Sequence, residues 1–528
     1  MYGLVRDGAL RYPSQPALSF MGRNITYAEL IRLIDQMADA LYTLGFRQGN
    51  VATLCIPNIP DAVIAFYAVN RLGGVANMVH PLTPAEELAH YIQTTDSEYL
   101  FILDAFLPKH LSMLEHSQIR KTIVASVPDY LSIGMAIGFW LKSGRKIPRV
   151  PATDAIICWK DALALAAMSV PGAGQAHETT DAHAPAVYLH SGGTTGSPKT
   201  ITLSSYNFNV LAIQGPQIIG FDMDTFDPSA QDFSMVSILP MFHGFGLCMG
   251  IHTIMANGMR SILVPQFSPD KLAEVIRKEH PSMMAAVPTL LEGIMKSKKL
   301  ADADLSCLAA VFCGGDSLPS ELKTRFDAFV KSRNGTCQVR EGYGLTETVT
   351  VCAVNPIGDN RANTVGVPLA DMAMKVVEPG TEREMPVGTD GEFCIAGPTV
   401  MLGYLNDPDA TKETIHTHAD GLRWVHTGDY GFMDEDGFFH FKQRIKRILK
   451  VSGIPVFPSQ IEDILMKVPG VREACVIGVP HPYKMQVVKA FIVRDAGAAP
   501  EEAMREAIIR HCADNIIRYA VPVEIEFR

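Results

Sequence analysis

Short apolar runs alternate with helical patterns between residues 51 and 312, and this alternation constrains the fold more than any other feature of the sequence. Residues 51–56 form an apolar run that ends at Pro57, and a helical pattern over residues 61–72 precedes Gly73-Gly74. This succession predicts a strand, a helix and a turn. Similar apolar runs return at residues 99–103, 122–125, 234–239, 261–264, 284–287 and 309–312. Strands alternating with helices indicate an α/β fold with largely parallel sheets covered on both faces.

The pattern differs at the two ends of the chain. Residues 26–44 have apolar side chains at helical spacing, and Thr26 with Glu29 forms a capping-box pattern, which predicts a surface helix. After Gly366, short apolar runs with turn dipeptides predict a small β-rich subdomain. The chain turns basic from Lys442, and a new αβ pattern follows. We therefore place a domain boundary near Arg444, between a large domain at residues 1–443 and a small α+β domain at residues 444–528.

Length and composition limit the classes of protein. A chain of 528 residues exceeds what one hydrophobic core usually supports, so we expect two or more domains. The net charge of −10 argues against a broad nucleic-acid surface, and we expect no nucleic-acid partner. The ten cysteines include no C-x-x-C pair, so neither a zinc ribbon nor a disulfide framework is indicated. This cysteine usage fits a reducing compartment, and we expect a cytoplasmic protein.

No uninterrupted apolar run reaches the length of a membrane span, and charges stand where a signal peptide would need its apolar region. We expect a soluble protein with at most peripheral membrane contact. The nearest approach to a membrane element is the apolar run at residues 130–141, which precedes Lys142, Arg145, Lys146 and Arg149. We favour a buried helix here over an interfacial one, because the polar face of a clean amphipathic helix is thin.

Residues 188–199 read Y-L-H-S-G-G-T-T-G-S-P-K, a turn rich in glycine and hydroxyl side chains that ends in a lysine. Its backbone N–H groups and hydroxyls suit a polyphosphate, and Lys199 adds a positive charge. A Walker A loop needs glycine before the lysine, whereas Pro198 removes a backbone donor there. We therefore predict a lid over phosphates, with an ordinary glycine-rich turn as the alternative.

Four further segments accompany this loop. They are L-P-M-F-H-G-F-G at residues 239–246, C-G-G-D at 313–316, E-G-Y-G-L-T-E-T at 341–348 and H-T-G-D-Y-G at 426–431 with its sequel to residue 462. In order and spacing, the five segments resemble the adenylate-forming (ANL) superfamily of AMP-dependent synthetases and ligases, and within it most closely acyl-CoA synthetases of the fatty-acid–CoA ligase type. The resemblance implies a large domain with two parallel-type sheets and a small β subdomain, followed by a small mobile C-terminal domain.

The resemblance also implies which residues bind ATP. The phosphate lid would comprise Ser191, Gly192, Gly193, Thr194, Thr195, Gly196 and Lys199. The adenine site would comprise Gly314, Gly315, Asp316, Glu341, Gly342, Tyr343 and Gly344, because glycines permit close approach and the tyrosine offers a stacking face. Asp429 and Arg444 would contact the ribose. Thr346 would bond the α-phosphate, and Glu347 would hold Mg²⁺ through its carboxylate.

Two more residues have implied roles in the reaction. His243 corresponds to a histidine at the acyl pocket of relatives, with a packed core imidazole as the alternative. Lys446 aligns with the hinge about which the small domain of relatives turns. The remaining histidines of the region, His416, His418 and His426, lack carboxylate or cysteine support for a metal site, and we expect them to be loop histidines.

This sequence departs from the pattern of its relatives in several places. Gly192 stands where Ser or Thr is usual, Thr200 where Gly is usual, and Gln443 where Gly or Asp is usual. Relatives also continue past a strand similar to residues 521–528 into a segment that holds the adenylation lysine, and this chain ends before such a segment. We expect from this either a truncated chain or an enzyme that is slow in its first half-reaction.

The implied activity is that of an AMP-forming acid–thiol ligase. A carboxylate is a poor electrophile, so such enzymes first form acyl-AMP from ATP with release of pyrophosphate, and the CoA thiol then displaces AMP. The resemblance implies a medium or long aliphatic acid as the substrate. An α-amino acid is less favoured, because residues 235–241 lack the acidic side chain that would hold the amino group. The alternatives are a domain that loads a carrier-protein phosphopantetheine and a non-catalytic acyl- or nucleotide-binding homologue; a luciferase is less favoured. We also leave open whether the protein forms a homodimer.

Overall fold

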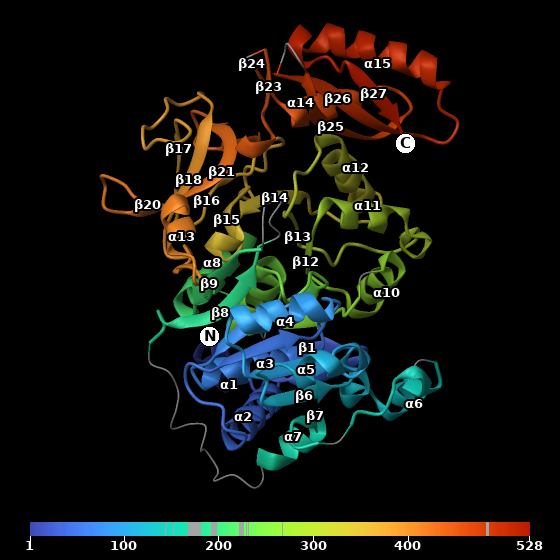
Figure 1. Ribbon diagram of the computed structural model, residues 1–528. Helices are drawn as coiled ribbons and strands as arrows, with labels where there is room; N and C mark the ends of the chain where they lie inside the picture. The colour runs from blue at the N-terminus through green and yellow to red at the C-terminus, as the bar shows by residue number, and fades with distance from the viewer. Residues whose placement is uncertain are drawn as a thin grey trace. The chain divides into compact units, whose positions relative to one another are not determined.

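The computed structural model describes residues 1–142, 144–151, 153–166, 181–191, 198–220, 226–228, 230, 232–266, 268–452, 454–481 and 485–528 (Figure 1). These residues form two compact units. The first comprises Met1–Arg361, Pro368–Ala373 and Ala396–Val425, and the second comprises Ala362–Val367, Met374–Ile395 and His426–Arg528. The functional boundary that we place near Arg444 stays a prediction.

Within the described residues, the largest sheet has the strand order β16-β15-β14-β13-β12-β10-β11-β1-β2. Its central strands are parallel and arise from the apolar runs of the sequence, as predicted. The strands are β1 (Pro16–Phe20), β2 (Arg23–Thr26), β10 (Ser234–Ser237), β11 (Arg260–Leu263), β12 (Met283–Ala286), β13 (Ala310–Cys313), β14 (Val339–Gly344), β15 (Val351–Val354) and β16 (Val367–Pro368). Apolar side chains of α10 (Pro269–Glu279), α11 (Pro288–Lys296) and α12 (Ser320–Lys331) share one core cluster with these strands.

A second sheet of the described chain has the order β19-β9-β8-β4-β3-β5-β6-β7. Its strands are β3 (Val51–Cys55), β4 (Val75–Met78), β5 (Tyr99–Leu103), β6 (Lys121–Ala125), β7 (Ile156–Cys158), β8 (Pro185–His190), β9 (Thr200–Ser204) and β19 (Gly403–Tyr404). The strands β3 to β8 pair in parallel, whereas β9 runs antiparallel to both β8 and β19. All residues of α3 (Pro60–Arg71) are buried, which is typical of a helix inside a core.

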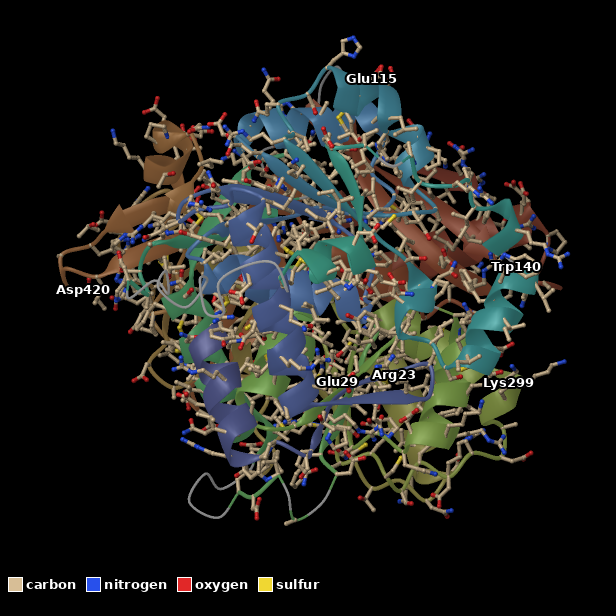
Figure 2. The ribbon with its side chains drawn as sticks, turned by 90° about the horizontal axis from the view of Figure 1, so that it is seen from below. Arg23, Glu29, Glu115, Trp140, Lys299 and Asp420 are labelled. Atoms are coloured by element: carbon tan, nitrogen blue, oxygen red, sulfur yellow. The ribbon has the colours of Figure 1, made fainter. Side chains whose placement is uncertain are left out.

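Helices of the first unit follow the sequence signals closely. In α2 (Tyr27–Thr43), the hydroxyl of Thr26 accepts a hydrogen bond from the backbone N–H of Glu29, as the capping pattern predicts. The Glu29 carboxylate pairs with Arg23 at 2.9 Å (Figure 2). The other α-helices here are α1 (Tyr2–Arg11), α4 (Ala85–Thr94), α5 (Leu111–Glu115), α6 (Ile133–Lys142), α7 (Trp159–Leu165), α8 (Ser205–Ile219), α9 (Thr253–Ala256) and α13 (Pro408–Thr414).

The interpretation of residues 130–141 as a buried helix is wrong. The helix α6 forms within this run, but none of its residues is buried. The apolar side chains that suggested a core helix are therefore exposed or only partly buried. Among the described residues, no helix combines the length and apolarity that a membrane span needs.

The second unit contains mostly antiparallel strands and a small α+β region. Its strands include β17 (Ala373–Val377), β18 (Gly391–Ala396), β22 (Phe439–Arg444) and most of β21 (Arg423–Met433), whose first residues pair with β20 (Ile415–Thr417). The C-terminal sheet comprises β23 (Leu449–Val451), β24 (Ile454–Val456), β25 (Val471–His481), β26 (Met485–Arg494) and β27 (Glu524–Phe527). The helices α14 (Pro458–Leu465) and α15 (Glu501–Asn515) share a core cluster with this sheet.

Candidate active site

Two glycine-containing segments meet at the carboxyl ends of β13 and β14. Because these strands are parallel with Cys313 opposite Glu341, the chain after each strand emerges at the same edge of the sheet. A Cβ on Gly314 would lie 3.1 Å from the backbone oxygen of Gly342, and Gly315 adopts a φ of +82°. A side chain at Gly314 would crowd this contact, and an L-residue at Gly315 would be strained. The structure therefore brings together the two segments predicted for adenine.

Glu341 is a carboxyl group held inside this edge. Its Oε1 atom accepts a hydrogen bond from the backbone N–H of Leu318 at 3.2 Å. Burial raises the pKa of Glu341 to about 7, because the protein interior disfavours the charged form. This hydrogen bond therefore attaches the loop that follows β13 to Glu341 in β14. Asp316 is exposed and accepts a hydrogen bond from the N–H of Ser317.

Thr346 and Glu347 lie in the short helix η8 (Thr346–Thr348), directly after β14. The phenolic O–H of Tyr404 donates to Glu347 Oε1 at 2.8 Å. The Lys199 ammonium lies 4.5 Å from the centre of the same Tyr404 ring, a cation–π distance. A carboxylate and a cation, both assigned to ATP binding from the sequence, therefore share one aromatic partner. Burial, followed by the charge of Glu347, raises the pKa of Tyr404, so its hydroxyl stays protonated and can donate.

Tyr404 was missed by the sequence analysis. It lies in β19, where it is opposite Ile201 of β9, two residues after Lys199. The signal that would reveal it is a strand pairing between segments about two hundred residues apart, which local spacing does not contain. Tyr404 is therefore an additional candidate site residue, because its hydroxyl donates a hydrogen bond to Glu347.

The base of the predicted phosphate lid is closed by hydrogen bonds between its two ends. The backbone N–H of Ser191 donates to the carbonyl oxygen of Lys199 at 3.0 Å, and the Lys199 N–H donates to Ser191 Oγ at 3.2 Å. The strands β8 and β9 thereby hold Lys199 in place beside Ser191. The lid residues Gly192, Gly193, Thr194, Thr195 and Gly196 lie outside the described residues.

His243 lies in a loop that contacts the Gly314 segment and the turn after η8. A Cβ on the following residue, Gly244, would lie 1.9 Å from the backbone oxygen of Val349, immediately after η8. Two residues later, Phe245 would be 3.5 Å from a Cβ on Gly314. The loop therefore approaches the adenine segment and the Thr346 turn together. The adjoining helix η6 (Phe245–His252) has π-helical geometry, which is frequent at functional sites.

The His243 ring keeps an exposed edge although nearby protein lowers its pKa by desolvation. Its Nδ1 atom accepts a hydrogen bond from the N–H of Phe245 at 3.2 Å, which requires Nδ1 to be unprotonated. Asn58 fixes the preceding residues, because its amide donates to the carbonyl oxygen of Leu239 at 2.8 Å and accepts from the N–H of Met241 at 3.0 Å. The sequence analysis did not identify Asn58 as a candidate site residue.

His190 ends β8 immediately before the lid. Its Nε2 atom is 2.7 Å from Asn77 Oδ1, and its Nδ1 atom is 3.1 Å from Thr200 Oγ1. Burial lowers the pKa of His190 to about 4, so the ring is neutral near pH 7. The neutral imidazole donates to Asn77 and accepts from Thr200. The Thr200 hydroxyl therefore contacts His190 at the base of the predicted lid.

In the second unit, the residues assigned to ribose form a pair. Asp429 and Arg444 face each other across β21 and β22, with Arg444 Nε 3.2 Å from Asp429 Oδ1. The Asp429 side chain is buried, whereas that of Arg444 is exposed. Gln443 is buried and accepts a hydrogen bond from Ser459 at 3.3 Å. Lys446 lies in the short helix η9 (Ile445–Arg447), which connects β22 to β23.

The expectation that the three remaining histidines lie in loops is wrong for two of them. His416 belongs to β20 and His426 to β21. His426 Nδ1 lies 3.3 Å from a carboxylate oxygen of Glu392, a partner that the sequence analysis did not identify. Hydrogen bonds from His426 and from the N–H of Gly428 lower the pKa of Glu392 even though burial opposes the shift. His418 is buried with its ring centre 5.7 Å from that of Trp424.

Comparison with known proteins decides the family. The model of the AMP-binding enzyme family matches residues 5–405, and that of the AMP-binding enzyme C-terminal domain matches residues 460–528. The chain belongs to the AMP-binding enzyme family. The predicted membership in the ANL superfamily, of acyl-CoA synthetase type, is thereby confirmed, and so is the predicted class of AMP-forming acid–CoA ligase.

Similar family members include curated CoA ligases. The chain is 29% identical over 534 residues to a long-chain-fatty-acid–CoA ligase of Bacillus subtilis, covering 100% of this chain and 91% of that protein. It is 30% identical over 539 residues to the long-chain-fatty-acid–CoA ligase of Salmonella typhimurium, covering 99% of this chain and 90% of that protein. A probable 4-coumarate–CoA ligase of Dictyostelium discoideum is 31% identical over 460 residues, covering 87% and 79%.

Solved structures show that the fold is that of the family. ATP-bound MatB from Rhodopseudomonas palustris superposes with a TM-score of 0.83 at 24% identity, covering 100% of this chain and 95% of that chain. The anthranilate CoA ligase AuaEII in complex with anthranoyl-AMP superposes with a TM-score of 0.80 at 22% identity, covering 100% and 93%. The predicted α/β fold with a smaller C-terminal domain is therefore confirmed.

Proposed function

We propose that this AMP-binding enzyme activates a long-chain fatty acid with ATP and transfers the acyl group to CoA, releasing AMP and pyrophosphate. The observation that carries the proposal is the arrangement of Glu347, Tyr404 and Lys199 beside the glycine-lined edge of β13 and β14. A carboxylate and an ammonium beside one phenol suit a metal-bound polyphosphate. The carboxylate can bind the metal cation, and the ammonium can bind the phosphate anions.

The protein residues act by binding and orientation. Adenine lies against the backbone of the Gly314 and Gly342 segments, and Tyr343 offers a stacking face. The Thr346 hydroxyl donates to the α-phosphate, and the Lys199 ammonium neutralises charge that develops on the leaving pyrophosphate. Thr346 and Lys199 together orient the phosphates for attack by the substrate carboxylate. For Asp429 and Arg444 of the second unit, contact with the ribose stays a prediction from the sequence.

The residues present fit a magnesium ion. Glu347 provides a hard oxygen ligand, and its carboxylate is oriented by the hydrogen bond from Tyr404 to one oxygen. A single protein carboxylate suits Mg²⁺, which usually keeps several waters and binds phosphate oxygens. When bound, the ion would stabilise negative charge on the phosphate oxygens. Within the chain, the task of Tyr404 is to keep the Glu347 carboxylate in one orientation.

A fatty acid is the favoured substrate for two reasons. Curated relatives that cover nearly the whole chain act on long-chain fatty acids by name. The segment that precedes His243 is Ser237-Ile238-Leu239-Pro240-Met241-Phe242, which provides no charged side chain for a polar acid. His243 is placed to interact with the acid carboxylate or to control access of the thiol, and its neutral form can do either without trapping a charge.

The experiment that tests the proposed function is a screen of acids with two readouts. Pyrophosphate release is measured with acetate, octanoate, palmitate, benzoate and malonate, and the acyl-CoA product is measured by mass spectrometry. Palmitate should give both products in the presence of CoA. Pyrophosphate without acyl-CoA would favour loading of a carrier protein, and ATP binding with neither product would favour a non-catalytic homologue.

The variant Glu347→Gln tests the metal ligand. Gln keeps the size of the side chain and can still accept from Tyr404, but it lacks the negative charge that binds Mg²⁺. We expect adenylation to fall at least about 100-fold at limiting Mg²⁺, with partial recovery as the Mg²⁺ concentration rises. Glu384→Gln, at an exposed acid, is the control. Unchanged turnover of Glu347→Gln at limiting Mg²⁺ would remove Glu347 from the site.

A further inference from the structure

The helix α6 exposes an apolar surface that the proposed activity does not use. Residues 133–141 contain no charged, amide or hydroxyl side chain, yet Ile133 is 83% exposed and Ile137 56% exposed. A Cβ on Gly134 or Gly138 would contact nothing within 4 Å, so the helix is open on these sides as well. Figure 1 shows α6 at the margin of the first unit, and Figure 2 shows Trp140 at its edge. Contiguous exposed apolar surface of this kind marks an interaction site.

Positive charge adjoins this surface. Residues 131–153 contain Lys142, Arg145, Lys146 and Arg149 but no Asp or Glu, although the whole chain has a net charge of −10. The Arg145 guanidinium lies 4.4 Å from the centre of the Trp140 ring. The side chains of Lys142 and Arg149 are exposed. A local cationic segment on an anionic protein is complementary to an anionic surface.

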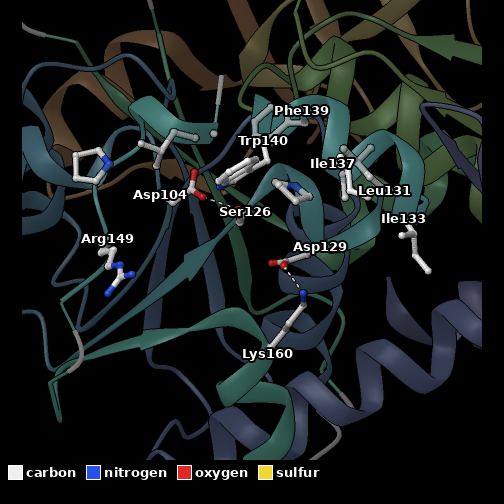
Figure 3. A pocket seen from close by; sticks show the side chains of 15 residues that line it. Asp104, Ser126, Asp129, Leu131, Ile133, Ile137, Phe139, Trp140, Arg149 and Lys160 are labelled. Carbon is white, nitrogen blue, oxygen red and sulfur yellow. Dashed lines mark hydrogen bonds and ion pairs between the residues drawn. The ribbon is translucent and has the colours of Figure 1, made fainter. Parts of the chain in front are cut away.

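The helix also stands away from the body of the unit. A cavity of about 760 Å³ lies between α6 and the ends of β5 and β6, and Ile137 and Trp140 line it while each stays more than half exposed. Figure 3 shows Trp140 among the residues that line the cavity, together with the Asp104–Ser126 hydrogen bond and the Asp129–Lys160 ion pair. Both acids that line the cavity thus have a partner on the body side, where Asp129 lies 3.1 Å from Lys160. The acids are engaged by the body of the protein, whereas Lys142, Arg145 and Arg149 are exposed, and of these three only Arg149 lines the cavity.

We propose that α6 and its basic sequel dock this protein on an anionic phospholipid bilayer. Ten helical residues span roughly 15 Å, about half of what crosses the hydrocarbon core, so the helix lies in the interface rather than across it. Ile133, Ile137 and Trp140 enter the acyl boundary, and Arg145 and Arg149 contact lipid phosphates. Tryptophan with basic side chains at one end suits the headgroup region. The proposal concerns binding alone and does not depend on the proposed function.

The test uses the full chain and lipid vesicles. Co-sedimentation is measured with vesicles of phosphatidylcholine and phosphatidylglycerol in equal parts, and with vesicles of phosphatidylcholine alone. We expect the protein to bind the anionic vesicles. Binding should be at least tenfold weaker with vesicles of phosphatidylcholine alone, and at least tenfold weaker at high salt. Trp140 gives a second readout, because Trp159 and Trp424 are 1% and 4% exposed. Its emission should shift to shorter wavelength on binding, and Trp140→Phe should abolish the shift.

Two double variants separate the apolar and ionic contributions. Ile137→Glu with Trp140→Glu should weaken binding at least about tenfold, and Arg145→Glu with Arg149→Glu at least about 25-fold, since each cation contributes roughly fivefold near an anionic membrane. Leu10→Glu and Lys331→Glu, at exposed positions outside this surface, should bind like the parent chain. Circular dichroism and pyrophosphate release should be unchanged in all four variants, which verifies their folding.

Three results would overturn the proposal. The first is equal binding of the parent chain and both double variants. The second is binding that is independent of anionic lipid and salt. The third is dimerisation in analytical ultracentrifugation that Ile137→Glu with Trp140→Glu abolishes, without vesicle binding by the parent chain, which would show that a second copy covers α6.

Discussion

At the scale of single residues, Tyr404 connects two charges of opposite sign in the candidate site. Its hydroxyl donates to Glu347 and its ring faces Lys199. Tyr404→Phe removes the hydrogen bond and keeps the ring, so we expect adenylation to fall about tenfold and to need more Mg²⁺. Pyrophosphate exchange measured against Mg²⁺ concentration checks this, with the exposed Tyr519→Phe as control. An unchanged Mg²⁺ dependence would show that Tyr404 does not position the carboxylate.

The raised pKa of Glu341 leads us to predict that the free energy of unfolding depends on pH. Burial raises its pKa from 4.5 to about 7. The folded state therefore keeps a proton that the unfolded state releases as the pH rises from about 4.5 to about 7, and the free energy of unfolding falls across this window before it levels off. Glu341→Gln cannot titrate and should lack this fall. Urea denaturation at a series of pH values checks it against the exposed Glu435→Gln; parallel curves for both variants would contradict the prediction.

At the scale of elements, the loop with His243 and the turn after η8 are held at backbone contact. A Cβ on Gly244 would lie 1.9 Å from the carbonyl oxygen of Val349. Gly244→Ala should therefore push the loop from the turn, lower the free energy of unfolding by about 1–3 kcal/mol and slow adenylation at least about tenfold. Gly358→Ala, where nothing lies within 4 Å, is the matched control for denaturation and pyrophosphate release. If the two variants behave alike, this contact does not position the site.

At the scale of the whole molecule, the linkage between β22 and β23 is where we predict a hinge that serves the two half-reactions. Lys446 lies in this linkage, and the family resemblance assigns it to the hinge. Lys446→Pro fixes φ at one residue and should retain one half-reaction while the other falls at least about tenfold. Lys446→Ala, which keeps backbone freedom, is the control. Pyrophosphate exchange and single-turnover transfer from supplied acyl-AMP measure the two steps separately. Equal loss of both would place the hinge elsewhere.

The sequence by itself determined the elements and the family. Strand and helix positions such as β5, β13 and α2 follow from side-chain periodicity and capping, which are properties of neighbouring residues. The motifs with Gly314, Glu347 and Asp429 identified the chemistry because each motif is short and continuous. Their joint occurrence in one order predicted the fold that the comparisons confirm.

Only the tertiary structure decided which distant side chains meet and which apolar runs are covered. Tyr404 lies beside Lys199 because β19 pairs with β9, and Glu392 reaches His426 across two strands; neither pairing has a local signal in the sequence. The run that becomes α6 has the composition of a core helix, yet it is exposed because the neighbouring elements leave a cavity beneath it. Burial depends on what the rest of the chain packs against a segment, and periodicity within that segment does not contain this information.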